Sequence, residues 1–360
     1  MSLPPVLHPA GSTPAAVPYK RIATEEAWCP AEMLDLYRGV LEAGTLDDPG
    51  FQTMFSFYLN SDSTRATEIR DYLVDIGDQR LKHMDERGID MQILSLTSPG
   101  VQVFEPELAT SFAALSNDML AEAVAKHPTR FAGLAAVAPQ QPDRAAAELE
   151  RSVRKLGLKG AVINSHTFGE YLDDPKYWPI LEAAEALEVP IYLHPQVPPP
   201  GLIGPLLERG LDGAIFGFAV ETGMHMLRIM IAGVFDRFPR LQFVLGHGGE
   251  ALPFWLYRLD YMHRAGVRSN RYESMRPVDR TISEYMRENV SITSSGVAWG
   301  PAITFCQQVL GSDRVMYAMD YPYQHGAEEV SGSDQFDMSD ADKLKFFQTN
   351  AERLFKLSPA

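Results

Sequence analysis

The stretch GAVINSHTFGEYLDDPKYWPILEAAEALEVPIYLH, residues 160–194, contains one complete unit of the predicted fold. It begins with a short apolar, β-branched run at 160–165 and ends with a second such run at 190–194. Between the two runs, residues 178–188 have the pattern of a helix. A strand, a helix and a second strand in this order are typical of a parallel βαβ unit.

The same alternation continues along most of the chain. The predicted strands are RIATEE (21–26), MQILSLT (91–97), FAGLAAV (131–137), GAVINS (160–165), PIYLH (190–194), QFVLGHG (242–248), VSITSS (290–295) and VMYAMD (315–320). The predicted helices include 68–87, 107–126, 144–155, 178–188 and 249–264. Eight strands, each followed by a helix or a helix-bearing insert, predict an α/β fold, a (β/α)8 TIM-like barrel, although a doubly wound sheet gives a similar alternation.

Three connections are longer than the others and are rich in Gly, Pro, Ser and Asp, namely 41–66, 196–215 and 265–285. We interpret them as inserted βα loops, which in a barrel lie at the catalytic face and shape the pocket. Residues 1–18 are rich in Pro and Ala and are predicted to form a flexible tail, so that 19–360 would be a single barrel domain.

The composition excludes several classes of partner. A net charge of −15 argues against nucleic acid, whose phosphates would be repelled. The most apolar stretch, 214–235, contains Glu221 and Arg228 and is predicted to be a buried helix rather than a membrane span. The two cysteines, Cys29 and Cys306, imply no disulfide framework, and the N-terminus does not resemble a signal peptide. We therefore expect a cytoplasmic protein that binds neither nucleic acid nor membrane.

Acids and histidines stand at the ends of the predicted strands, where packing of a barrel core does not explain them. Parallel strands bring their C-terminal ends to one rim, so these side chains should converge there. They are Glu25, Glu26, His166, His194, His247 and Asp320. Among them, the convergence of Glu25, His194 and Asp320 is the least easily explained by chance.

Each of the other polar residues also has a structural interpretation. Glu26 alternates with Glu25 and is expected to point to the opposite face, where a salt bridge to a helix would satisfy it. His166 could be a metal ligand, a substrate contact or a loop histidine. His225 and His263 lie inside helical patterns and are expected to be structural.

Several strings resemble the decarboxylase branch of the amidohydrolase superfamily, from about residue 20 to about residue 356. They are IATEEAW, LTSPGVQ, INSHT, IYLHP, GLDGAIFGFAVETGMH, GHGGEALPFWLYRLDYMH, CQQV and MYAMDYPYQ. The branch includes γ-resorcylate, 2,3-dihydroxybenzoate and 5-carboxyvanillate decarboxylases, and the resemblance is greatest to the last group. The long string that begins GHGGE is the most specific of them.

This resemblance implies roles for individual residues. Glu25, His194 and Asp320 match the positions that bind one divalent metal ion in the family. His247 and Glu250 match a catalytic dyad beside the metal, and Asp320 is expected to be catalytic as well. The family also implies a homo-oligomer, a dimer or a tetramer, in which neighbouring subunits sometimes contribute to the site.

The resemblance further implies a set of substrate contacts. Arg65 matches a substrate-binding arginine in the connection after the first strand, and Tyr58 lies upstream of it. Arg258 and Tyr323 lie in the two strings that match best and are further candidates. The position two residues after Glu25 is Ala27, where many hydrolytic relatives have a histidine, so the departure counts mildly against a hydrolase.

The chemistry of these residues agrees with a decarboxylase. Two carboxylates and one imidazole suit Mn2+, with Zn2+ or Mg2+ as alternatives. The sequence has no GxGxxG motif that opens a βαβ unit, so no organic cofactor is expected. A phenol oxygen and its ortho carboxylate could chelate the ion. We expect Asp320 to protonate the ring carbon before the C–C bond breaks, with His247 and Glu250 shaping the charge and proton supply.

The expected reaction is therefore the non-oxidative decarboxylation of a hydroxylated aromatic acid. The expected substrate is 5-carboxyvanillate, converted to vanillate and carbon dioxide in the catabolism of lignin-derived aromatic compounds. One alternative is a metal-dependent hydrolase or hydratase on the same barrel. The other is a catalytically silent metal-binding barrel.

Overall fold

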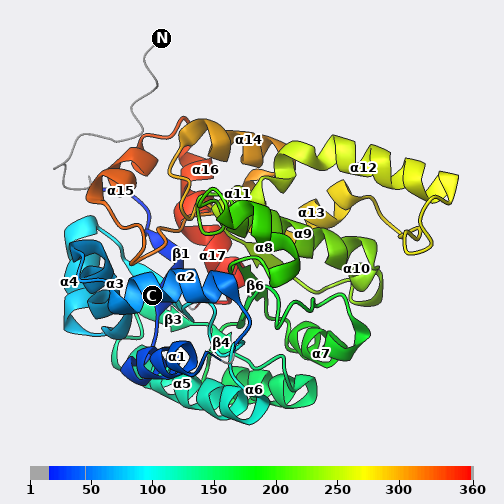
Figure 1. The fold of residues 1–360 in the computed structure, drawn as a ribbon. Helices are drawn as coiled ribbons and strands as arrows, with labels where there is room; N and C mark the ends of the chain where they lie inside the picture. Colours follow the sequence, from blue (N-terminus) through cyan, green and yellow to red (C-terminus); the bar gives the residue numbers. More distant parts are fainter. Residues whose placement is uncertain (1–15, 45, 358–360) are drawn as a thin grey trace.

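A ring of short parallel strands, surrounded by helices, forms the centre of the molecule (Figure 1). The computed structural model describes residues 16–44 and 46–357. The strands are β1 (Ile22–Trp28), β2 (Met91–Leu96), β3 (Phe131–Gly133), β4 (Ala135–Ala136), β5 (Ala161–Asn164), β6 (Ile191–His194), β7 (Phe243–Leu245), β8 (Val290–Thr293) and β9 (Val315–Met316).

The helices form an outer layer and several inserts. They are α1 (Ala31–Ala43), α2 (Pro49–Asn60), α3 (Thr64–Val74), α4 (Asp78–Arg87), α5 (Pro106–Lys126), α6 (Pro142–Arg154), α7 (Trp178–Leu187), α8 (Pro200–Leu207), α9 (Gly217–Ile231), α10 (Val234–Arg237), α11 (His247–Glu250), α12 (Leu252–Ser269), α13 (Ile282–Asn289), α14 (Gly300–Leu310), α15 (Ala327–Asp334), α16 (Asp340–Leu344) and α17 (Asn350–Leu354).

The strands pair in chain order, in one sheet from β1 to β3 and another from β4 to β9. The third predicted strand is split into β3 and β4 at Leu134, whose N–H still donates to a carbonyl of β2 at 2.9 Å. Between β9 and β1 the ring is closed by two hydrogen bonds, from the N–H of Thr24 to Tyr317 O at 3.1 Å and from the N–H of Ala27 to Tyr321 O at 2.7 Å. Counting β3 and β4 as one strand leaves eight positions, so the predicted (β/α)8 barrel is confirmed.

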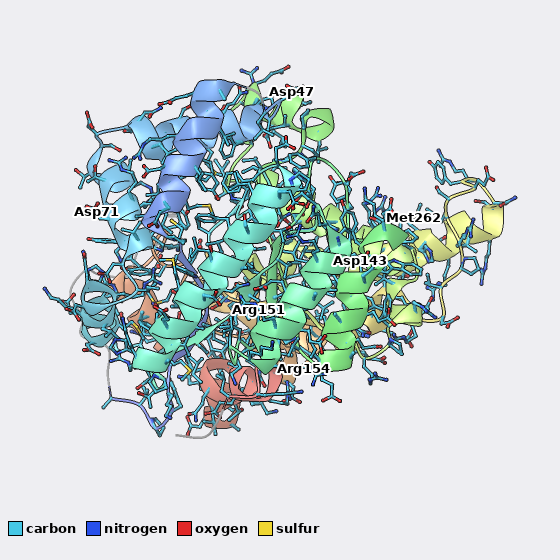
Figure 2. All side chains as sticks on the ribbon, turned by 90° about the horizontal axis from the view of Figure 1, so that it is seen from below. Asp47, Asp71, Asp143, Arg151, Arg154 and Met262 are labelled. Carbon is cyan, nitrogen blue, oxygen red and sulfur yellow. The ribbon has the colours of Figure 1, made fainter. Side chains whose placement is uncertain are left out.

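The outer helices bury the strands on the side that faces away from the barrel axis. Every residue of β1, β5 and β8 is buried, as expected for parallel strands covered on both faces. Figure 2 shows α5 and α6 side by side, and Arg151 of α6 pairs with Asp118 of α5 at 2.7 Å.

The predicted buried helix at 214–235 is α9, in which Glu221 and His225 are fully buried. No helix in the described residues is long and apolar enough to cross a membrane.

Two of the predicted loops contain helices. Within 41–66 the chain forms α2, and within 196–215 it forms α8. Pro49 and Pro200 stand at the first position of these helices, where a backbone N–H is not needed and the fixed φ of proline suits the helix. The two segments are inserts after a strand, as predicted, and the helices within them were not assigned from the sequence.

Two predicted helices also differ from the observed ones. The segment 68–87 is divided into α3 and α4 at Asp75, whose carboxylate accepts hydrogen bonds from the N–H groups of Gly77 and Arg80. The helix predicted at 249–264 begins at Leu252, continues to Ser269 and projects from the body (Figure 1). Residues 1–15 of the predicted tail lie outside the described residues, and the division into a tail and one domain stays a prediction.

Candidate active site

Three of the predicted site residues meet at the C-terminal rim of the barrel. Glu25 on β1 is buried, with 3% of its surface exposed. Its Oε1 atom lies 3.4 Å from Nε2 of His194, at the end of β6, and 3.4 Å from Nε2 of His247, which follows β7. Convergence of strand ends in a parallel barrel accounts for this cluster.

The hydrogen bond of His194 defines which ring nitrogen is free. Nδ1 of His194 lies 2.8 Å from the carbonyl oxygen of Pro195, and a carbonyl can only accept, so Nδ1 carries the hydrogen. In the neutral ring Nε2 then presents its lone pair to Glu25. Oε1 of Glu25 is buried and has no hydrogen-bond partner. Two acceptor atoms therefore face each other, an arrangement that a cation between them would satisfy.

The second oxygen of Glu25 is held by two residues that the sequence interpretation missed. Tyr192 donates its hydroxyl hydrogen to Oε2, and the hydroxyl of Thr293 lies 3.2 Å from the same atom. Strand alternation could have indicated Tyr192, because it lies two residues before His194 and therefore on the same face. Gly246 leaves room for this carboxylate, since a Cβ atom there would lie 2.5 Å from Oε2.

Charges in the cluster act on both acids. Burial opposes ionisation of Glu25, but the charge of His247 and the hydroxyl of Tyr192 help to outweigh it, and the pKa of the Glu25 carboxyl is lowered. Burial and the charge of Glu25 raise the pKa of Asp320, against the opposing effect of the two histidines. Asp320 therefore lies within electrostatic range of Glu25 and both imidazoles. Its backbone has a φ of 77°, a left-handed conformation that is uncommon outside glycine.

His247 and Glu250 form a hydrogen-bonded pair in a tight turn. Nδ1 of His247 donates to Oε1 of Glu250 at 2.8 Å, and Glu250 is buried. The turn has positive φ at His247, Gly248, Gly249 and Glu250; glycine adopts this conformation freely, so the strain lies at His247 and Glu250. Burial disfavours the charged imidazole, but Glu25 and Glu250 outweigh it and raise the pKa of His247 to about 10. The two neighbouring carboxylates therefore favour the charged form of this imidazole.

The donor set fits a divalent cation, although the side chains do not form a finished coordination shell. Within the described ranges, no group of three or more His, Cys, Asp or Glu side chains could hold a metal ion as placed. The fit rests on the unpartnered oxygen of Glu25 facing the free nitrogen of His194. A carboxylate and an imidazole, with the acid Asp320 in electrostatic range, suit Mn2+.

Three of the predicted substrate contacts lie together at the same rim. Arg65 is exposed on the first turn of α3, and its guanidinium donates to the carbonyl oxygen of Tyr323 at 3.2 Å. The ring of Tyr323 lies 5.8 Å from that of Tyr58 on α2, and its hydroxyl bonds with Thr97 at 2.7 Å. Burial raises the pKa of Tyr58, and the charge of Asp320 adds to this effect, so these residues lie near the acid.

The structure places the fourth predicted contact, Arg258, elsewhere. Arg258 is exposed on the projecting helix α12. Its role as a substrate contact stays a prediction.

His166 is a buried loop histidine. Its Nε2 donates to the carbonyl of Val197 at 3.0 Å, and its Nδ1 accepts from the N–H of Gly169 at 3.1 Å. Burial lowers the pKa of His166 to about 4. It lines a cavity of about 420 Å³ together with Gln196, and none of the candidate metal ligands lines this cavity. Of its three interpretations, the geometry favours the loop histidine.

Comparison with known proteins adds three similar enzymes. A family model described as Amidohydrolase matches residues 62–357. The γ-resorcylate decarboxylase of Polaromonas sp. (strain JS666) is 38% identical over 301 residues, which cover 81% of this chain and 90% of that protein. A solved 5-carboxyvanillate decarboxylase from Novosphingobium aromaticivorans, complexed with manganese and 4-hydroxy-3-methoxy-5-nitrobenzoic acid, is 55% identical with a TM-score of 0.93, over 94% of this chain and 97% of that one. A dihydroxybenzoic acid decarboxylase from Polaromonas sp. JS666 was solved with bound manganese and the inhibitor 2-nitroresorcinol. It is 35% identical with a TM-score of 0.80, and the match covers 95% of this chain and 98% of that one.

Proposed function

Because the chain belongs to the amidohydrolase family, we propose that it is a metal-dependent decarboxylase of a hydroxylated aromatic acid. The observation that carries the proposal is the pair of facing acceptor atoms on Glu25 and His194, which a bound cation would satisfy. Manganese is named in two of the similar solved structures, so one Mn2+ ion is expected and no organic cofactor. The expected substrate is 5-carboxyvanillate, which would give vanillate and carbon dioxide.

Glu25, His194 and Asp320 would hold this ion. When bound, it supplies positive charge that stabilises the phenolate oxygen and the ortho carboxylate of the substrate. Tyr192 fixes one oxygen of Glu25 and leaves the other directed at the site. The bond to Pro195 keeps the lone pair of His194 directed at the same place.

Asp320 is the group expected to move the proton. It accepts the phenol proton when the substrate binds and delivers it to the ring carbon that carries the carboxylate. The C–C bond then breaks, its electron pair returns to the ring, and carbon dioxide leaves. Glu250 keeps His247 charged and oriented, and the charged imidazole stabilises negative charge near the ring. The product phenolate then regains a proton from solvent.

Carbon dioxide release over a panel of hydroxybenzoates tests the reaction. We expect 5-carboxyvanillate to yield equal amounts of carbon dioxide and vanillate, measured by gas analysis and chromatography. Aromatic acids without an ortho hydroxyl should react much more slowly, because they cannot present the phenolate and carboxylate together. A product that retains the carboxylate and gains water would instead indicate the hydratase alternative.

Arg65 is proposed to bind the substrate carboxylate that is not removed. Replacing Arg65 by Lys should lower kcat/KM by roughly ten- to a hundredfold. The reason is that a lysine ammonium cannot reproduce the bidentate hydrogen bonding of a guanidinium to a carboxylate, which is worth about 1.5 to 3 kcal/mol. Arg38→Lys is the matched control, since Arg38 is a partly exposed arginine of α1 that pairs with Asp35. Steady-state kinetics equal to wild type in both variants would place Arg65 outside the site.

The homo-oligomer expected from the sequence also stays a proposal, and α12 is the candidate interface. This projecting helix exposes a row of large side chains that would be costly to leave in water; Met262 is labelled on it in Figure 2. They are Phe254, Trp255, Tyr257, Tyr261 and Met262. Light scattering should give two or four times the mass of one chain, and a monomer at micromolar concentration would contradict this.

The cytoplasmic location expected from the sequence likewise remains a prediction. Cys29 and Cys306 are both free and buried, which agrees with a reducing compartment. Fractionation of the source cells would test it.

A further inference from the structure

The backbone around Asp320 cannot form a regular strand ladder. β9 ends at Met316, and the left-handed φ of Asp320 turns the chain away from strand geometry four residues later. Such a turn leaves the N–H groups on either side of Asp320, those of Met319 and Tyr321, without the partners that a neighbouring strand would provide. Both residues are buried, so water cannot replace these partners.

Glu26 provides both missing partners with one side chain. Its Oε1 accepts from the N–H of Met319 at 3.0 Å, and its Oε2 accepts from the N–H of Tyr321 at 3.2 Å. Glu26 is fully buried, and the register of β1 shifts between Ala23 and Glu26. The salt bridge to a helix expected for Glu26 is therefore not its main contact; the carboxylate bonds to the backbone that carries Asp320.

A second layer holds Glu26 in place. Gln92 of β2 donates to Oε2 of Glu26 at 3.3 Å and accepts from the guanidinium of Arg80 at 3.3 Å. Arg80 of α4 is fully buried, donates to the carbonyl of Ala27 at 2.7 Å, and lies 4.5 Å from the ring centre of Tyr321. The contact chain from α4 through Gln92 and Glu26 thus ends on the two residues that flank Asp320.

We propose that Glu26 is a positioning residue of the site, which fixes the strained backbone at Asp320 so that this acid can bind the metal and reach the substrate. The inference rests on the proposed metal site. Glu26 touches neither the substrate nor the ion in this account; it acts through the N–H groups of Met319 and Tyr321. Residues that orient a metal ligand from outside are a general feature of metal centres.

Glu26→Gln is the sharpest test, because it changes one atom and keeps the shape. The amide oxygen can accept a hydrogen bond from one of the two N–H groups, but the NH2 group must then face the other N–H. The variant therefore keeps only one of the two hydrogen bonds that clamp the backbone on either side of Asp320. We expect Mn2+ to bind about 10- to 100-fold more weakly, measured by electron paramagnetic resonance of the free ion. At saturating Mn2+, kcat should fall while KM changes little.

Asn117→Asp is the matched control, because Asn117 forms the same kind of clamp away from the site. Its amide accepts from the N–H of Ala136 and donates to the carbonyl of Ala136, both at 2.8 Å, on β4. This variant should lower the melting temperature yet keep the wild-type Mn2+ affinity and kcat. The proposal is overturned if Glu26→Gln keeps wild-type Mn2+ affinity and kcat, or if Asn117→Asp loses as much of both.

Two further measurements keep the test decisive. If Glu26→Gln does not fold, Gln92→Met removes both the donor to Glu26 and the acceptor of the Arg80 guanidinium but leaves Glu26 in place. This variant should weaken Mn2+ binding in the same direction by a smaller factor, and unchanged affinity in it overturns the proposal. Wild-type protein that binds no Mn2+ contradicts the proposed function itself. Normal Mn2+ binding by wild type, with no loss in Glu26→Gln, contradicts only the role of Glu26.

Discussion

Replacement of His194 by Ala is expected to abolish stoichiometric Mn2+ binding and, with it, the release of carbon dioxide. The lone pair of Nε2 faces the unpartnered oxygen of Glu25, and no other group in the described residues is proposed to replace it. The loss should exceed the roughly 100-fold effect of removing an outer partner of a metal ligand. Metal analysis after gel filtration, with activity measured on the same sample, checks this.

The fold should survive this change, because the rim of a barrel contributes little to its packed core. His127→Ala is a suitable control, since His127 ends α5 and stands just before β3, away from the rim. It should retain full Mn2+ content and activity. Full metal occupancy in His194→Ala, with a normal thermal transition, would show that the ligand set is wrong.

Asp320→Asn should be essentially inactive even when it is loaded with metal at high concentration. Asn tolerates the left-handed backbone at this position nearly as well as Asp, so the loop should keep its conformation. An amide cannot carry the proton, and loss of a positioned proton donor costs on the order of a hundred- to ten-thousandfold in rate. Rapid kinetics with metal content measured in parallel provide the comparison.

His247→Asn is the companion variant that separates the two candidate acids. It removes the charged imidazole but leaves Asp320 in place, so it should bind Mn2+ and keep a measurable residual rate. In heavy water, the active form should place one deuterium at the vacated ring position, which mass spectrometry detects. If metal-loaded Asp320→Asn turns over well while metal-loaded His247→Asn is inactive, the proton comes from His247.

The barrel and part of the site could be predicted because both follow from strand ends. Alternation of short apolar runs with helices indicated eight strands, and parallel strands must bring Glu25, His194 and His247 to one rim. Helices α2 and α8 were missed because proline at a first helical position has the same sequence signal as proline in a loop.

The partners of each acid could not be predicted in the same way. The hydroxyl of Thr293 on β8 reaches Glu25 on β1, and the two N–H groups bound by Glu26 lack strand partners because Asp320 has a positive φ. Neither contact leaves a local pattern in the sequence, since both depend on backbone conformation and on residues more than 250 positions apart. Contacts of this kind emerge only when the barrel closes.

Addition of Mn2+ to metal-free wild-type protein is the most direct test of a catalytic metal held at Glu25, His194 and Asp320. Carbon dioxide release from 5-carboxyvanillate would be measured on the same samples as bound Mn2+, after removal of metal by a chelator. We predict no release without metal and a linear recovery that reaches its plateau at about one Mn2+ per chain. Full activity in the metal-free protein, or recovery unrelated to the bound ion, would contradict the account.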